Sequence, residues 1–122
     1  RKLGEVKEKA VERRLENILV LSRLRNGSIG MKEESLNVVL LFDILHRYYF
    51  PSEESRSKVL RDVYRLLKPG ALLLVHPTHI DQSKLTGEIV HAGFEFRDKI
   101  TGNLIHDGNC TKSSILAFRR FV

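Results

Sequence analysis

Polar and ionisable side chains follow two apolar runs of this 122-residue chain, and they are the residues best suited to chemistry. Asp43 comes directly after VVLLF (residues 38–42), and His76 directly after ALLLV (residues 71–75). Open α/β sheets bind ligands outside the carboxyl ends of their strands, so a carboxylate at such an end can contact a cofactor or substrate. The alternative is that Asp43 only caps the turn after the strand.

Three aromatic residues, Tyr48, Tyr49 and Phe50, follow Asp43 closely. Such rings can form a lid or the wall of a substrate site, but packing is the favoured interpretation for at least two of them.

The other reactive side chains form no metal-binding or hydrolytic pattern. His76, His79 and His106 lack the tight Cys/His spacing of a metal site, so we expect no metal. Cys110 is the only cysteine, which excludes an internal disulfide and fits a reducing compartment. We also find no Ser-His-Asp or Cys-His signature.

Composition indicates a cytoplasmic globular protein. The chain is 42% hydrophobic, and no apolar run approaches the ~18 residues that span a bilayer, so we expect no membrane partner. The formal net charge is +6, but the basic residues are dispersed, which favours a solvated surface. A nucleic-acid partner stays open.

The order of the expected elements defines the fold class. Apolar runs without alternation predict strands covered on both faces, and 3.6-residue apolar periodicity predicts helices. The expected helices span residues 2–15, 53–67 and 81–92, and the expected strands 17–21, 38–42, 71–75, 94–100 and 112–121. Residues 22–35 and 101–111, which contain Gly and Asn, are expected loops. Strands that alternate with helices predict an α/β sheet with right-handed parallel crossovers.

Four segments in order resemble a known family. They read LNVVLLFDILHRY, RLLKPGALLLV, HAGFEFRDKI and SSILAFRRF. Together they resemble the C-terminal half of a class I S-adenosylmethionine-dependent methyltransferase. The resemblance implies a three-layer Rossmann-like sheet, mostly parallel, with an antiparallel last strand between residues 71–75 and 94–100. It also implies that residues 1–122 are one partial domain, incomplete at the N-terminal side.

The same resemblance assigns site residues. It implies that the cofactor S-adenosylmethionine is contacted by Phe42, Asp43, Ser28 and Ile29. It places His46 at the mouth of the active site as a catalytic residue that orients or deprotonates a nucleophile. The alternative for His46 is a surface histidine packed on Tyr49, and for Ser28 and Ile29 a simple turn. Tyr48 and His76 are assigned to the substrate.

The expected function is methyl transfer from S-adenosylmethionine to an unknown acceptor by a larger protein. The family's glycine-rich turn and ribose-binding acid have no counterpart here, since no G-x-G occurs. We therefore expect this chain to be an inactive fragment that binds the cofactor weakly or not at all. The alternative is a non-catalytic interaction module. An open edge at residues 38–42 would pair either with residues 17–21 or with a second copy of the chain. Pairing with a second copy would give a homo-oligomer.

Overall fold

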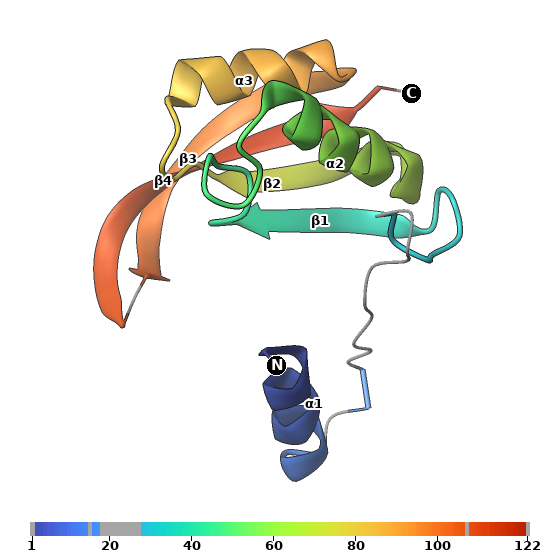
Figure 1. Ribbon diagram of the computed structural model, residues 1–122, viewed down its shortest axis with the longest axis vertical. Coiled ribbons are helices and arrows are strands. Elements are labelled where there is room, and N and C mark those ends of the chain that lie inside the picture. The colour runs from blue at the N-terminus through green and yellow to red at the C-terminus, as the bar shows by residue number, and fades with distance from the viewer. Residues whose placement is uncertain (1, 15, 18–27, 107, 122) are drawn as a thin grey trace. The chain divides into compact units, whose positions relative to one another are not determined.

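The computed structural model describes residues 2–14, 16–17, 28–106 and 108–121, in two compact units, Arg1–Met31 and Lys32–Val122 (Figure 1). Residues 18–21 of the expected strand at 17–21 lie outside the described residues, so its pairing stays a prediction.

The first unit contains α1 (Lys2–Glu12). Glu5 in its first turn and Lys9 in its last turn complement the helix dipole. Ala10 is buried. The helix ends at Glu12, and Arg14, two residues later, has a left-handed φ of 55°. It is therefore shorter than the expected helix at 2–15.

The second unit is built on a four-stranded sheet. Its strands are β1 (Leu36–Phe42), β2 (Leu67–His76), β3 (Phe94–His106) and β4 (Asn109–Arg120), in the spatial order β1-β2-β4-β3. β1 and β2 are parallel, and β4 is antiparallel to both β2 and β3. Both expectations about the sheet are confirmed: the strands at 38–42 and 71–75 are parallel neighbours, and the antiparallel last strand lies between β2 and β3.

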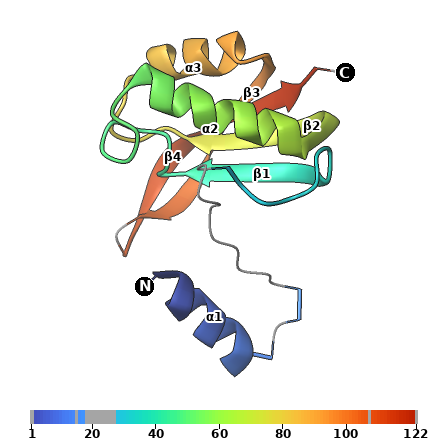
Figure 2. The ribbon, with the colours of Figure 1, turned by 45° about the vertical axis from the view of Figure 1, so that its right-hand side comes forward.

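Two helices cover one face of this sheet, as the two views in Figures 1 and 2 show. α2 (Glu53–Leu66) connects β1 to β2, and α3 (Gln82–His91) connects β2 to β3. Ser52 caps α2 by accepting the Ser55 N–H at 3.0 Å, and Asp81 caps α3 by accepting the Lys84 N–H at 2.9 Å. Each cap satisfies a helical donor that would otherwise lack a partner.

The hydrophobic core lies between these helices and the sheet. In the sheet, Leu73 pairs with Phe118 and Val75 with Leu116, and all four side chains are buried. The helices contribute further buried apolar side chains: Leu60, Val63, Leu85 and Ile89. Burial of each such side chain stabilises the fold by about 1.5–3 kcal/mol, so the core fixes which helix faces point inward.

The expected loop at 101–111 is wrong. β3 continues to His106 and β4 begins at Asn109, so these residues form a long hairpin in which His106 pairs with Asn109. The missed signal is the sequence Asp107-Gly108, a dipeptide that favours two-residue hairpin turns, and Gly108 has a φ of 78°. Cross-strand pairing explains why polar residues here form strands rather than a loop.

The start of β2 also differs from the expectation. The sequence Lys68-Pro69-Gly70 ends α2 as expected but lies inside β2. Pairing jumps from Leu36–Leu67 to Val38–Leu72, so residues 68–71 fall in an irregularity of the ladder. Such a bulge tolerates proline, which donates no hydrogen bond.

β1 lies at one end of the sheet, where in the described part of the chain it pairs with β2 alone. On the face that α2 and α3 do not cover, Val38, Leu40 and Leu72 are exposed. The proposed homo-oligomer through this edge is untested. None of the helices in the described ranges is long and apolar enough to cross a membrane.

Two glycines of the α3 region should respond oppositely to alanine. Gly93 has a φ of 108°, and a Cβ there would lie 3.1 Å from the Tyr64 ring, so Gly93→Ala should lower the free energy of unfolding by about 1–3 kcal/mol. Gly87, inside α3, has no neighbour within 4 Å of an added Cβ. Gly87→Ala should therefore raise the free energy of unfolding by about 1 kcal/mol. Urea unfolding measures both, and equal effects would contradict the backbone assignment.

Candidate functional site

The candidate site lies at the carboxyl ends of β1 and β2. Because the two strands are parallel and Phe42 pairs with His76, the segments that follow them start side by side. The rings of Phe42 and His76 meet edge to face, 6.2 Å between centroids. The structure therefore brings together the predicted residues Phe42, Asp43 and His76.

Asp43 is held between the two segments. Its Oδ1 accepts a hydrogen bond from the Thr78 hydroxyl at 2.6 Å and lies 3.4 Å from His46 Nε2. The Asp43 side chain is 36% exposed, so the carboxylate still reaches solvent. The contact with Thr78 joins the end of β1 to the end of β2, which goes beyond capping a local turn.

Two backbone positions of the site are left-handed. Asp43 has a φ of 59° and His79 a φ of 55°. Aspartate and histidine tolerate this region better than most residues, yet it costs free energy, of order 1–3 kcal/mol per residue. Strained residues of this kind gather at functional sites, and these two lie together, with His79 Nε2 4.0 Å from Asp43 Oδ1.

His46 is buried, so the alternative of a surface histidine is wrong, although its ring does pack on Tyr49 with centroids 4.6 Å apart. Its Nδ1 accepts the backbone N–H of Tyr48 at 3.2 Å. A neutral imidazole has one acceptor nitrogen, so this bond assigns the proton to Nε2, which faces Asp43. The geometry favours an orienting role over proton abstraction, and the catalytic role stays a prediction.

Tyr48 and His79 form the exposed side of the site. Their ring centroids are 4.9 Å apart, and the His46 and His79 rings meet edge to face at 5.1 Å. Arg47 Nε donates to the His79 carbonyl at 3.1 Å, a second link between the two segments. Tyr48 lies beside these residues, and its assignment to the substrate stays a prediction.

A buried ion pair anchors the segment that carries these residues. Arg56 of α2 binds Glu88 of α3 through two parallel hydrogen bonds, Nε to Oε1 at 2.7 Å and Nη2 to Oε2 at 2.9 Å. Arg56 Nη1 donates to the Phe50 carbonyl at 2.9 Å, and both charged side chains are buried. Hydrogen bonding to Glu88 raises the pKa of Arg56, although burial acts in the opposite direction. Arg56 therefore stays charged and ties the end of the 43–50 segment to both helices.

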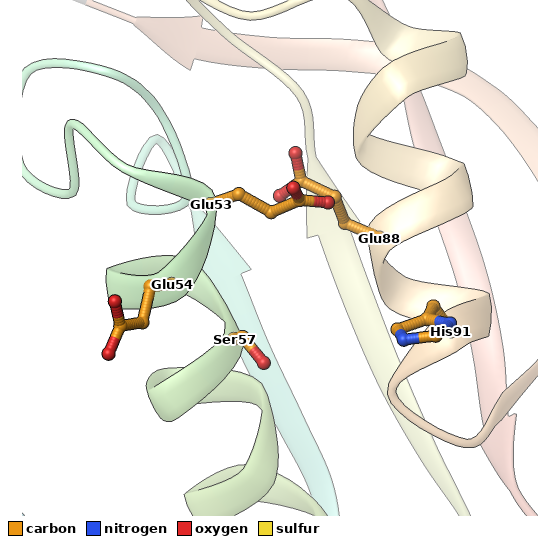
Figure 3. Close-up of a pocket in the computed structure, with 5 residues that line it drawn as sticks. All are labelled: Glu53, Glu54, Ser57, Glu88 and His91. Carbon is orange, nitrogen blue, oxygen red and sulfur yellow. The ribbon is translucent and has the colours of Figure 1, made fainter.

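A separate cavity of about 310 Å³ lies between α2 and α3. Figure 3 shows Glu53, Glu54 and Ser57 on α2, with Glu88 and His91 on α3. Glu88, one of the acidic residues that line this cavity, is already bound to Arg56, so the cavity borders the buried ion pair. None of the predicted site residues lines it.

Two residues predicted to contact the cofactor lie in the other unit. Ser28 and Ile29 belong to the first unit, and their cofactor role stays a prediction. No group of three His, Cys, Asp or Glu residues in the described ranges is placed to hold a metal ion. Cys110 is exposed on β4.

Sequence reasoning missed three residues that organise the site. Thr78 follows β2 closely, so the strand-end rule that selected Asp43 would have found it. Arg56 and Glu88 are 32 residues apart, and no local pattern marks a pair of that separation.

Comparison with known proteins finds similar structures, whereas no family profile and no curated sequence matches. A SAM-dependent methyltransferase of Methanosarcina mazei is 15% identical, with a TM-score of 0.63 over 78% of this chain and 64% of its own. The [4+2]-cyclase SpnF is 15% identical, with a TM-score of 0.67 over 98% of this chain and 62% of its own. The N-methyltransferase NodS of Bradyrhizobium japonicum is 11% identical, with a TM-score of 0.56 over 75% of this chain and 55% of its own.

These similarities establish the fold. The second unit has the mixed α/β sheet of class I SAM-dependent methyltransferases, as the sequence resemblance implied. The chain spans less than two thirds of the length of the M. mazei protein, SpnF and NodS. SpnF is named a cyclase, so the fold alone does not define the reaction.

Breaking the buried pair should cost far more than breaking an exposed one. Glu88→Gln leaves the buried Arg56 charge without a counter-ion, so the free energy of unfolding should fall by about 3–5 kcal/mol. Glu95→Gln removes the partly exposed partner of Arg97 and Arg119 and should cost about 0–1 kcal/mol. Urea unfolding of both variants measures the difference, and a Glu88→Gln cost no larger than that of Glu95→Gln would contradict the anchoring role.

The hydrogen bond from Tyr48 also predicts the tautomer of His46. In long-range ¹H–¹⁵N spectra at pH 8, His46 should show a protonated Nε2 and an unprotonated Nδ1. A proton on Nδ1 would contradict this arrangement and leave Nε2 available to accept a proton.

Proposed function

We propose that the protein containing this chain transfers a methyl group from S-adenosylmethionine to an acceptor, and that the chain supplies the half of the domain that faces the reacting groups. One observation carries the proposal. Asp43 presents a partly exposed carboxylate at the adjoining ends of β1 and β2, where open α/β sheets bind ligands. The whole-protein activity is a proposal because the chain is shorter than the proteins it resembles.

The residues of this site fit the chemistry of methyl transfer. S-adenosylmethionine supplies an already activated methyl group on a positive sulfonium, so the protein mainly has to position donor and acceptor in line. Asp43 offers a negative charge next to a positively charged ligand, and Thr78 and His46 hold that carboxylate in place. Phe42 and Asp43 are proposed to border the methionine end of the cofactor.

The chain fits only part of that cofactor. No G-x-G occurs in the sequence, so it lacks the glycine-rich turn whose backbone N–H groups can approach a ligand closely. The proposed cofactor residues Ser28 and Ile29 lie in the first unit. Complete cofactor binding is therefore proposed for the larger protein.

The charge of Asp43 should be needed for the reaction. In the larger protein, Asp43→Asn keeps the shape of the side chain and tolerates the left-handed backbone, but removes the charge. Cofactor affinity or turnover should fall by about tenfold or more, a factor equivalent to ~1.4 kcal/mol. Transfer of label from methyl-tritiated S-adenosylmethionine to an acceptor-containing extract measures turnover. Glu54→Gln, a change in the cavity between α2 and α3, should retain full activity. If Glu54→Gln lost activity while Asp43→Asn kept it, the active site would lie at that cavity instead.

This chain by itself should not bind the cofactor tightly. Calorimetric titration of the 122-residue chain with S-adenosylmethionine should give a dissociation constant no tighter than about 1 mM, or −4 kcal/mol. A low-micromolar constant, roughly −8 kcal/mol, would show that the described strand ends suffice for binding.

A further inference from the structure

The geometry at the strand ends points to a binding site for a small organic ammonium ion, formed by the Asp43 carboxylate and the rings of Tyr48 and His79. The site would take an alkylamine or arylalkylamine in its protonated form. Three features of the described residues lead to this assignment: the charge on Asp43, the two rings beside it, and the groups that hold them.

Asp43 supplies the charge in a fixed position. Thr78 donates to its Oδ1 at 2.6 Å, and His46 Nε2 approaches the same oxygen at 3.4 Å. The Asp43 side chain is 36% exposed, so a ligand can reach the carboxylate group from solvent. A carboxylate whose orientation is set before binding loses less entropy when it pairs with a cation.

The rings supply a surface for the carbon groups next to that cation. Tyr48 is 72% exposed and His79 is 44% exposed, and their centroids are 4.9 Å apart at an interplanar angle of 65°. An organic ammonium spreads its charge over adjacent C–H groups, which aromatic faces attract electrostatically. Neither ring is buried in the core, so this exposed aromatic area is open to a ligand.

The nearby cationic side chain, Arg47, is bound to the backbone of the β2 segment, because its Nε donates to the His79 carbonyl. The nitrogen of an ammonium ligand would pair with Asp43, and its hydrocarbon part would lie against the Tyr48 ring. Asp43 repels a carboxylate next to the amine, so a simple amine should bind at the rings more tightly than an amino acid.

The acceptor in the proposed reaction would accordingly be a small amine. This step rests on the proposed function, whereas the ammonium site does not. The methionine end of S-adenosylmethionine also carries an ammonium, but beside a carboxylate, so the two sources of the same charge can be distinguished by experiment.

The test uses the ¹⁵N-labelled 122-residue chain at pH 8, titrated with tert-butylammonium chloride. tert-Butanol serves as a neutral probe of the same shape. The ammonium should shift the amide signals of Asp43, Tyr48 and His79 with a millimolar dissociation constant, and tert-butanol should bind at least about fivefold more weakly. Equal binding of the two probes would overturn the proposal.

Variants separate this site from the acidic cavity between α2 and α3. Asp43→Asn should weaken tert-butylammonium binding about fivefold or more, Tyr48→Leu about threefold, and Tyr48→Phe should leave it unchanged. Glu54→Gln, whose side chain lines the cavity, should also leave it unchanged. Signal shifts centred on Glu53 and Glu88, or unaltered affinity in Asp43→Asn, would overturn the proposal.

A last arm identifies the source of the ammonium. L-Methionine carries the ammonium and carboxylate of the cofactor's methionine end, and it should bind the chain more weakly than tert-butylammonium. Tighter binding of L-methionine at Asp43 would overturn the acceptor assignment. Because all these measurements record binding without turnover, failed methyl transfer in the larger protein would not be confused with failure of this site.

Discussion

The buried pair between Arg56 and Glu88 is the interaction on which the candidate site depends. Its two parallel hydrogen bonds join α2 to α3, and the third donor of Arg56 reaches the Phe50 carbonyl at 2.9 Å. Two charges taken out of water are stable only when fully hydrogen-bonded to one another, so this geometry tolerates little displacement. The pair therefore fixes the end of the segment that starts at Asp43, while β1 fixes its beginning.

Parallel pairing of β1 with β2 provides the other constraint. It places Phe42 beside His76, so that the residues after each strand share one edge of the sheet. Thr78, His79 and Arg47 then cross-link the two segments through hydrogen bonds to Asp43 and to the backbone. The left-handed conformations of Asp43 and His79 persist because these contacts and the anchored Phe50 over-determine the path of the chain. The contacts from Thr78 and His46 keep the partly exposed Asp43 carboxylate in one orientation.

Patterns that repeat locally were predictable, and contacts between distant residues were not. The runs at 38–42 and 71–75 are continuously apolar, which sufficed to predict two parallel strands, and Gly93 follows the end of α3 as predicted. The expected cover on both faces is not found in the described residues, where Val38, Leu40 and Leu72 are exposed. The hairpin at 101–111 was missed because its stability comes from cross-strand pairing of residues that individually favour turns. Asp43 was predictable from its place after a strand, but the burial of His46 and its bond to Tyr48 depend on tertiary packing. The role of Arg56 could not be inferred for the same reason.

Amide hydrogen exchange measures most directly whether the ion pair between α2 and α3 orders the strand-end site. The Tyr48 N–H donates to the buried His46 ring, so its exchange rate reports whether the segment keeps its fold. The measurement compares Glu88→Gln with the wild type under conditions where the variant is still folded. The Tyr48 amide of the variant should exchange about tenfold faster or more than that of the wild type. Its rate should also rise relative to the rates of the Leu73 and Val75 core amides, which shows that the loss of order is local. If the Tyr48 amide keeps its wild-type exchange rate in that variant, the ion pair does not order the site.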